Sequence, residues 1–184
     1  MRTVFFDIDT QLDFLYPSGA LYVPKAERIV PAIARLNQFA AANAIPLVST
    51  TDAHAEDDPE FAAWPPHCIA GTLGQRKPQA TLVGGSQIIL EKQTVDAFQS
   101  PNMPTLLERL NAESYVVYGV VTEICVLCAV RGLLKTGKPV TLVTDAVESL
   151  RAEDSARAIE EMRAGGAKLA TVAGICNQLA SSVI

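Results

Sequence analysis

The sequence predicts an α/β protein: a three-layer α/β/α sandwich built around a six-stranded, mostly parallel sheet. Short apolar runs alternate along the chain with longer segments whose apolar residues recur at helical spacing. The apolar runs lack the polar alternation of a strand with one face in water, which is typical of parallel strands covered by helices on both faces. Because strands and helices alternate, right-handed strand–helix–strand crossovers are the simplest connections.

The expected elements follow one another in a regular order. We expect strands at residues 4–8, 46–50, 87–91, 114–119, 139–143 and 168–172. Helices are expected at residues 25–42, 123–135 and 152–164. The second helix is expected to end before Gly137 and the third before Gly165 and Gly166, since glycine often follows the last turn of a helix.

Length and composition favour one domain, residues 1–184, with an ordinary hydrophobic core. A net charge of −5 without a basic stripe argues against nucleic acid and anionic membranes as partners. The chain has no secretory pattern at its N-terminus and no apolar run near the roughly twenty residues that span a bilayer. Its four cysteines are not spaced as a disulfide framework, which favours a cytoplasmic location. The apolar segment 126–134 fits a subunit interface as well as the core, so a homo-oligomer stays open.

One segment is too long for a plain connection. An insert at about residues 51–85 lies between two expected strands and contains the single Trp of the chain, both histidines and four prolines. Long ordered loops of this kind are usually functional.

Two charged residues directly follow expected strands, where open α/β sheets bind ligands. Asp9 is a candidate general base, although for a single aspartate a turn-capping role is the simpler interpretation. Lys92 is a candidate for stabilising a thiolate, and its ordinary alternative is a solvated lysine beside Glu91.

Cys125 has a distinctive position in the first turn of a helix that follows an apolar strand and Gly119. Free N–H groups and the positive end of the helix dipole there favour a thiolate and can bind an oxyanion. The alternative is an inert buried cysteine, which is our interpretation of Cys68, Cys128 and Cys176. A redox pair or half a zinc site at Cys125 and Cys128 is disfavoured because no second cysteine pair accompanies it.

The insert contains both histidines of the chain, near acidic residues. Asp52, His54 and His67 form a candidate site for a divalent metal, zinc first and iron or manganese as alternatives, with Glu60 as a further candidate oxygen ligand. The competing interpretation is that both histidines are ordinary polar surface residues.

Taken together, these motifs resemble a known family. Asp9-x-Gln11-x-Asp13-Phe14, Lys92 followed by Asp96-Ala97-Phe98, and Gly119-Val120-Val121-Thr122-x-x-Cys125-Val126 are similar to the three signatures of the isochorismatase-like cysteine hydrolases. The insert, with Asp52-x-His54 and Trp64-Pro65-Pro66-His67-Cys68, resembles the metal loop of the nicotinamidase/pyrazinamidase branch. The resemblance covers essentially the whole chain and implies a Rossmann-like strand order.

The resemblance also implies a function and a mechanism. The chain is expected to convert nicotinamide to nicotinate and ammonia, in NAD salvage, through a thioester on Cys125, with Asp9 moving protons and Lys92 holding the pair. The backbone N–H groups of Val121 and Cys125 would form the oxyanion hole, next to a cis peptide between Val120 and Val121. The metal would orient the pyridine ring, and Phe14, Trp64 and Val120 would contact the substrate.

Departures from the family pattern leave alternatives. Asp7 would raise the pKa of Asp9 if its side chain pointed into the site. Ile124 stands where the family often has an aromatic residue or His. The alternatives are a related cysteine hydrolase acting on another small amide or ureido substrate, and a metal-binding protein without catalysis. Hydrolysis of isochorismate is disfavoured, since that vinyl ether requires neither a thioester nor a ring-orienting metal.

Overall fold

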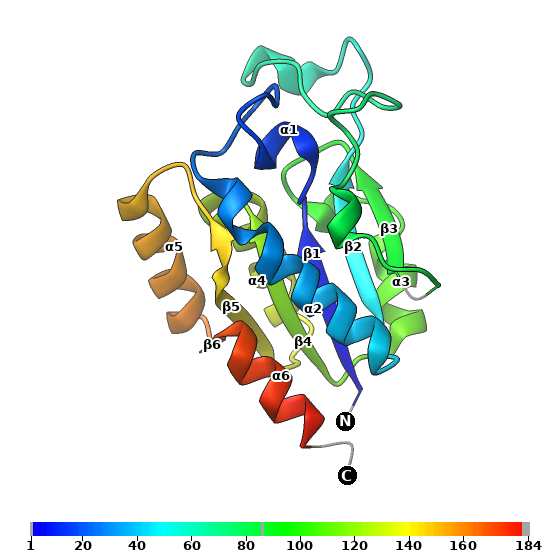
Figure 1. The fold of residues 1–184 in the computed structure, drawn as a ribbon, viewed down its shortest axis with the longest axis vertical. Coiled ribbons are helices and arrows are strands. Elements are labelled where there is room, and N and C mark those ends of the chain that lie inside the picture. The colour runs from blue at the N-terminus through cyan, green and yellow to red at the C-terminus, as the bar shows by residue number, and fades with distance from the viewer. Residues whose placement is uncertain (1, 86, 182–184) are drawn as a thin grey trace.

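Figure 1 shows the computed structural model, which describes residues 2–85 and 87–181. Six parallel strands form the sheet in the order β3-β2-β1-β4-β5-β6, so the sheet is wholly parallel where we expected mostly parallel. This is the predicted Rossmann-like order. The strands are β1 (Thr3–Ile8), β2 (Leu47–Asp52), β3 (Gln87–Lys92), β4 (Ser114–Val120), β5 (Val140–Glu148) and β6 (Lys168–Ala170).

Helices cover both faces of the sheet, as the apolar strands predict (Figure 1). α2 (Val30–Ala42) and α6 (Val172–Ala180) lie on one face, and α3 (Met103–Leu110), α4 (Leu127–Leu134) and α5 (Ala152–Ala164) lie on the other. A short α1 (Leu12–Leu15) follows β1. Alternate residues of β1 enter the two cores: Val4, Phe6 and Ile8 face one, and Phe5 faces the other.

Several boundaries differ from the sequence-based expectations. β5 continues to Glu148, past the expected end at residue 143, and its pairing with β4 shifts register between Val117 and Gly119. β6 ends at Ala170 because Thr171 caps α6, accepting a hydrogen bond from the Gly174 N–H; α6 was not expected. α3 was not expected either.

The two expected helices at residues 25–42 and 123–135 begin irregularly. A 3₁₀ turn, Ala26–Ile29, precedes α2, and a π-helical turn, Thr122–Val126, precedes α4. Wide turns of this kind often occur at functional sites, and this one contains Cys125.

Residues 53–85, which we call the β2–β3 loop, first lie above the carboxyl ends of the strands and then descend beside α2 to the start of β3 (Figure 1). The loop holds two short 3₁₀ helices, Pro59–Ala62 and Gln79–Thr81, and an isolated parallel bridge between His54 and Ile69. It corresponds to the insert expected at about residues 51–85.

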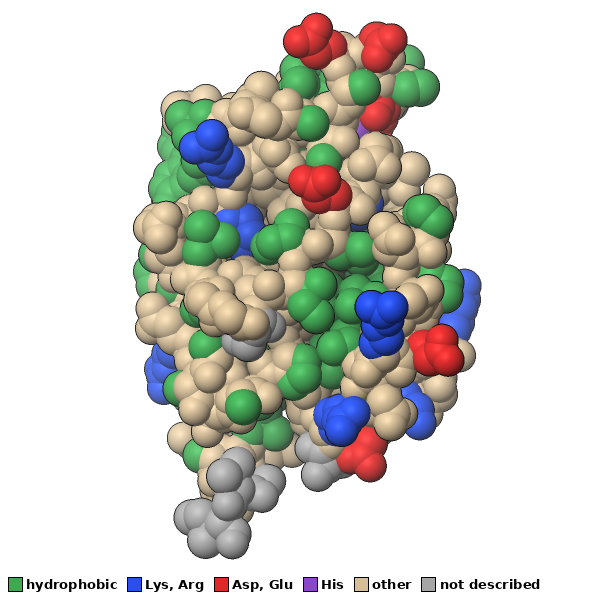
Figure 2. All heavy atoms as spheres, turned by 90° about the vertical axis from the view of Figure 1, so that its right-hand side faces the viewer, with side chains coloured by type: hydrophobic (Ala, Val, Ile, Leu, Met, Phe, Trp, Pro, Cys, Tyr) green, Lys and Arg blue, Asp and Glu red, His purple; other side chains and the backbone are tan. Residues whose placement is uncertain are grey.

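Apolar surface is concentrated at one edge of the sheet. The side chains of Ile88 and Ile89 on the edge strand β3 are exposed, and hydrophobic side chains gather on this side of the molecule (Figure 2). The segment 126–134, considered above for an interface, instead buries Val126, Val130 and Leu133 in the core. Among the described residues, no helix has the length and apolar character required to cross a membrane.

The end of β4 depends on a glycine that no other residue can replace without strain. Gly119 has a φ of 124°, and a Cβ there would lie 2.1 Å from the carbonyl oxygen of Ile8. We predict that Gly119→Ala lowers the free energy of unfolding by about 2–4 kcal/mol, measured by urea denaturation. Gly84→Ala is the matched control, because Gly84 has open space around it and ordinary φ. Equal stability of the two variants would contradict this account.

Candidate active site

The carboxyl ends of four neighbouring strands bring the predicted catalytic residues together. Asp52 and Lys92 are Cα partners in the register of β2 and β3, and Asp9 directly follows β1. Cys125 lies in the wide turn after β4, which pairs with β1 up to Gly119. Since β3, β2, β1 and β4 are consecutive neighbours, residues far apart in sequence share one rim.

Lys92 lies between two carboxylates. Its Nζ is 2.8 Å from Asp9 Oδ2 and also contacts Asp52 Oδ1, and all three side chains are buried. Burial alone would lower the pKa of Lys92, but the charges of Asp9, Cys125 and Asp52 raise it well above its usual range. Lys92 therefore stays protonated and keeps a positive charge inside the site.

The two carboxylates respond differently to this environment. Burial raises the pKa of Asp9, although Lys92 and a 2.6 Å hydrogen bond from the Thr50 hydroxyl oppose the change. Burial also acts on Asp52, but Lys92 and His54 outweigh it and lower the pKa of Asp52. Asp9 is thus the carboxylate with the greater tendency to accept a proton.

Cys125 is a buried thiol beside this pair. The N–H groups of Ile124 and Val126, on either side of it, both donate to the Val121 carbonyl, and the peptide between Val120 and Val121 is cis. Burial raises the pKa of Cys125 well above its usual value; Lys92 opposes this shift, and Asp9 adds to it through its charge and a hydrogen bond. We expected the helix dipole and Lys92 to favour the thiolate, but burial outweighs them. The resting group is a thiol next to a base.

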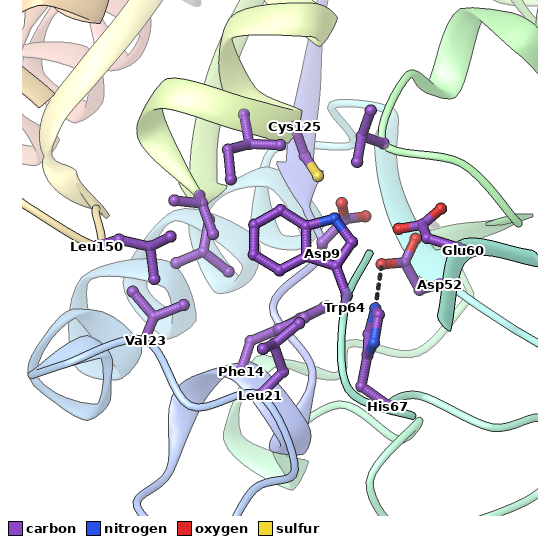
Figure 3. A pocket seen from close by; sticks show the side chains of 14 residues that line it. Asp9, Phe14, Leu21, Val23, Asp52, Glu60, Trp64, His67, Cys125 and Leu150 are labelled. Carbon is purple, nitrogen blue, oxygen red and sulfur yellow. Dashed lines mark ion pairs between the residues drawn. The ribbon is translucent and has the colours of Figure 1, made fainter. Parts of the chain in front are cut away.

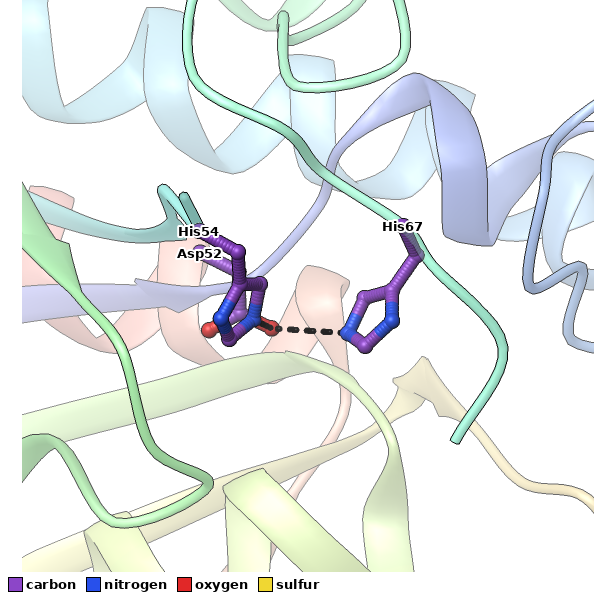
Figure 4. Close-up of side chains that lie close together, drawn as sticks. All are labelled: Asp52, His54 and His67. Atoms are coloured by element: carbon purple, nitrogen blue, oxygen red, sulfur yellow. Dashed lines mark ion pairs between the residues drawn. The ribbon is translucent and has the colours of Figure 1, made fainter. Parts of the chain in front are cut away.

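Three side chains converge on a candidate metal centre (Figure 4). Asp52 Oδ2 lies 3.8 Å from Nε2 of both His54 and His67, and the three ligand atoms lie within 4.8 Å of one another. His67 Nδ1 donates to the Pro65 carbonyl oxygen at 2.7 Å, and His54 Nδ1 lies 3.0 Å from Asp58 Oδ2. With both Nδ1 atoms engaged, the Nε2 lone pairs face the centre, and the buried Nε2 of His54 has no hydrogen-bond partner.

This donor set fits a divalent cation. Two imidazole nitrogens and one carboxylate oxygen suit zinc, and suit iron or manganese with added waters. Without a cation, burial lowers the pKa of His54, but the neighbouring carboxylates of Asp52 and Asp58 outweigh burial and raise the pKa to about 9, so protons compete with a metal. Glu60 lies outside the group of three converging ligands and instead lines the neighbouring pocket.

One pocket joins the thiol to the candidate metal centre (Figure 3). It encloses about 460 Å³, partly open to solvent, and its wall includes Asp9, Asp52, His67 and Cys125. The three predicted substrate contacts, Phe14, Trp64 and Val120, line it, and so does Val121 of the predicted oxyanion hole. Ile124, noted above as a departure from the family pattern, is also part of the wall, whereas Leu21, Val23, Val95 and Leu150 were not recognised from the sequence.

Asp7 does not enter this pocket. Its carboxylate accepts hydrogen bonds from Thr10, Asn37 and Ser49 and pairs with Lys77, and it is not among the main causes of the raised pKa of Asp9. The suggestion that Asp7 raises this pKa is therefore wrong, because the side chain is held by partners on the α2 side of the sheet.

Three supporting residues were not recognised from sequence. Thr50 fixes Asp9, Asp58 fixes His54, and Gln11 bonds both backbone groups of Asp52, with its Oε1 accepting from the N–H at 2.7 Å and its Nε2 donating to the carbonyl at 2.8 Å. Gln11 could have been recognised, because it belongs to the motif Asp9-x-Gln11-x-Asp13-Phe14. No sequence pattern pointed to Thr50 or Asp58.

The opposing effects on Cys125 predict an unusual mutational result. Asp9→Asn removes a carboxylate that raises the pKa of Cys125, so the thiol pKa falls and the thiolate fraction at pH 7–8 increases. We expect iodoacetamide to alkylate Cys125 about tenfold faster, or more, in this variant, measured in a Cys128→Ser background. Glu60→Gln removes another pocket carboxylate and should leave the rate near wild type. A rate in Asp9→Asn that is unchanged or slower would contradict the electrostatic account.

Comparison with known proteins agrees with this geometry. Residues 3–174 match the model of the Isochorismatase domain. The nicotinamidase of Escherichia coli (strain K12) is 25% identical over 201 residues, covering 90% of this chain and 93% of that protein. A pyrazinamidase of Pyrococcus horikoshii in complex with zinc is 28% identical, with a TM-score of 0.87 over 93% of this chain and 99% of its own.

A pyrazinamidase/nicotinamidase of Streptococcus mutans is also similar, with 28% identity and a TM-score of 0.85 over 91% of this chain and 99% of its own. The family model covers most of the chain, and the structural similarity to each of these two enzymes extends over more than 90% of it. The chain therefore belongs to the isochorismatase family and is a hydrolase similar to the nicotinamidases and pyrazinamidases of that family.

Proposed function

We propose that this protein hydrolyses nicotinamide to nicotinate and ammonia through a thioester on Cys125. The observation that carries the proposal is a single pocket into which the thiol, its neighbouring base Asp9 and two of the three candidate metal ligands all open. The similarity to nicotinamidases and pyrazinamidases supports the same substrate class.

The proposed reaction begins with transfer of the thiol proton from Cys125 to Asp9 as the sulfur attacks the carboxamide carbon. Negative charge on the carbonyl oxygen is then stabilised by the backbone N–H groups of Val121 and Cys125. When the tetrahedral intermediate collapses, Asp9 gives its proton to the departing amine, which leaves as ammonia.

The second half of the reaction hydrolyses the thioester. Asp9, again a carboxylate, removes a proton from water as the water oxygen attacks the acyl carbon; the C–S bond breaks, nicotinate leaves and the Cys125 thiol is restored. Throughout both steps Lys92 stays protonated and stabilises negative charge on Asp9 and on the sulfur.

Asp52, His54 and His67 would hold the divalent cation, with zinc the first candidate, and Glu60 lines the pocket beside them. A cation held by these residues would supply Lewis acidity toward the ring nitrogen of the substrate, which would help to orient the ring. Phe14 and Trp64 would contact the ring faces, and the chain itself excludes water through the apolar wall opposite the candidate centre.

The nearest alternative is another small amide or ureido compound. The pocket wall carries the carboxylates of Asp9, Asp52 and Glu60, whereas no Lys or Arg is among the described residues that line it. The buried ammonium of Lys92 is already paired twice. An anionic substrate, such as an N-carbamoyl amino acid, would therefore meet three carboxylates with no Lys or Arg in the described lining to balance them, which favours a neutral carboxamide.

Ammonia release from nicotinamide tests the proposed function. We expect wild-type turnover to fall at least about a thousandfold in Cys125→Ala, because the covalent route is lost, while the matched Cys128→Ala variant keeps its activity. Chelation should reduce kcat/KM at least about tenfold, and added zinc should restore it. Turnover that survives in Cys125→Ala would contradict the thioester route, and full activity after complete metal removal would contradict the role of the cation.

Substrate charge provides a second test. We expect kcat/KM for N-carbamoylglycine to be at least about a hundredfold below that for nicotinamide, since like charges brought together in a buried pocket cost several kcal/mol. Nicotinamide and N-carbamoylglycine should be compared at the same pH by ammonia release. A preference for the anionic compound would favour the ureido alternative.

A further inference from the structure

A second buried ion pair lies outside the catalytic pocket. Lys77 Nζ is 2.8 Å from Asp7 Oδ2 and also contacts the Thr10 hydroxyl. The side chain of Asp7 is fully buried and that of Lys77 is 3% exposed. The pair joins β1 to the β2–β3 loop, across 70 residues of sequence.

The Asp7 carboxylate is held from several sides. Thr10 Oγ1 donates to its Oδ1 at 2.7 Å, and Asn37 Nδ2 and Ser49 Oγ donate to its Oδ2 at 2.9 and 3.2 Å. Apolar residues of similar volume often stabilise a protein as much as a buried ion pair does. We therefore interpret the contacts of Asp7 as fixing the position of Lys77.

Lys77 ends a loop segment, residues 74–77, that runs beside residues 11–13 after β1. The carbonyl oxygens of Gly74, Gln75 and Arg76 accept hydrogen bonds from the Asp13 N–H at 3.0 Å, Gln11 Nε2 at 2.7 Å and the Leu12 N–H at 2.8 Å, respectively. Directly after this run, Lys77 turns inward to Asp7. The ion pair therefore fixes the end of the segment that orients residues 11–13.

Those residues in turn hold the candidate metal ligands. Gln11 bonds both the N–H and the carbonyl oxygen of Asp52, and Asp13 Oδ2 accepts from the N–H of Cys68, the neighbour of His67. A path of hydrogen bonds and adjacent backbone residues thus leads from Lys77 through Gln11 to Asp52, and through Asp13 and Cys68 to His67.

We propose that Asp7 and Lys77 are positioning residues for the metal centre, keeping the β2–β3 loop in the arrangement in which Asp52 and His67 converge. The inference rests on the proposed metal site and is independent of the proposed substrate. Neither residue touches the pocket, so both act through Gln11 and Asp13.

Lys77→Met tests this proposal, because it removes the ammonium while keeping most of the side-chain volume. Zinc affinity is measured by competition with a chromophoric chelator, and amide hydrogen exchange is followed in peptides from residues 65–80 of the metal-free protein. We expect zinc affinity to fall about 10–100-fold, as when partners of metal ligands are lost, and exchange in this segment to accelerate at least tenfold.

Tyr118→Phe is the matched control. Its hydroxyl donates to Asn37 Oδ1 at 2.6 Å, so the variant loses a buried hydrogen bond of the same network without touching Lys77. We expect a lower melting temperature with zinc affinity and loop exchange near wild type. A purely structural role for Lys77 would give this same result in Lys77→Met, and that outcome would overturn the proposal.

The experiment also decides the matter if Lys77→Met does not fold or if the wild-type protein binds no zinc. If Lys77→Met does not fold, Asp7→Asn/Lys77→Met removes both charges and leaves no unpaired buried ion, and the same two measurements decide. If the wild-type protein binds no zinc, the proposed metal site fails, and the exchange experiment alone tests the loop: unchanged exchange in residues 65–80 would overturn the positioning role.

Discussion

The arrangement of the site depends on one buried ammonium group. Lys92 is held between Asp9 and Asp52, and removing either carboxylate would leave a buried charge with weaker compensation. These three residues come from the ends of β3, β1 and β2, so the three strands must end at the same level. The pairing of Asp52 with Lys92 in the sheet register meets this condition, and a slip of one residue would turn Lys92 to the opposite face.

This arrangement also explains why the candidate base Asp9 lies next to the candidate metal ligands. Asp52 offers one oxygen to Lys92 and the other to the two histidines, so the candidate catalytic and metal groups share a carboxylate. The short motif after β1 supports both groups, because Asp9 faces the thiol, Gln11 binds the Asp52 backbone and Asp13 holds the chain beside His67. The alternate residues Asp9, Gln11 and Asp13 thus support both the candidate catalytic group and the candidate metal centre.

Sequence patterns predicted the features that depend on residues close together in the chain, which are the strands and the motifs at their ends. Apolar runs identified all six strands, and motif positions at their ends located Asp9, Lys92 and Cys125. Helix α3 was overlooked although its signal was present in the sequence, because its apolar residues recur at helical spacing: Met103, Leu106, Leu107 and Leu110. Helix α6 was not recognised because Gly174 interrupts an apolar sequence. The thiol form of Cys125 and the separation of Asp7 from the site could not be predicted, since both depend on burial and on partners distant in sequence.

The central claim is that Cys125 becomes acylated with Asp9 as its base. The most direct measurement is acid quenching within the first turnover of nicotinamide, followed by mass spectrometry of the peptide that contains Cys125. The account predicts a nicotinoyl adduct on this peptide that accumulates and then decays as nicotinate appears. Consumption of nicotinamide with the Cys125 peptide unmodified at every time point, or with the acyl group on the Asp9 peptide, would contradict it.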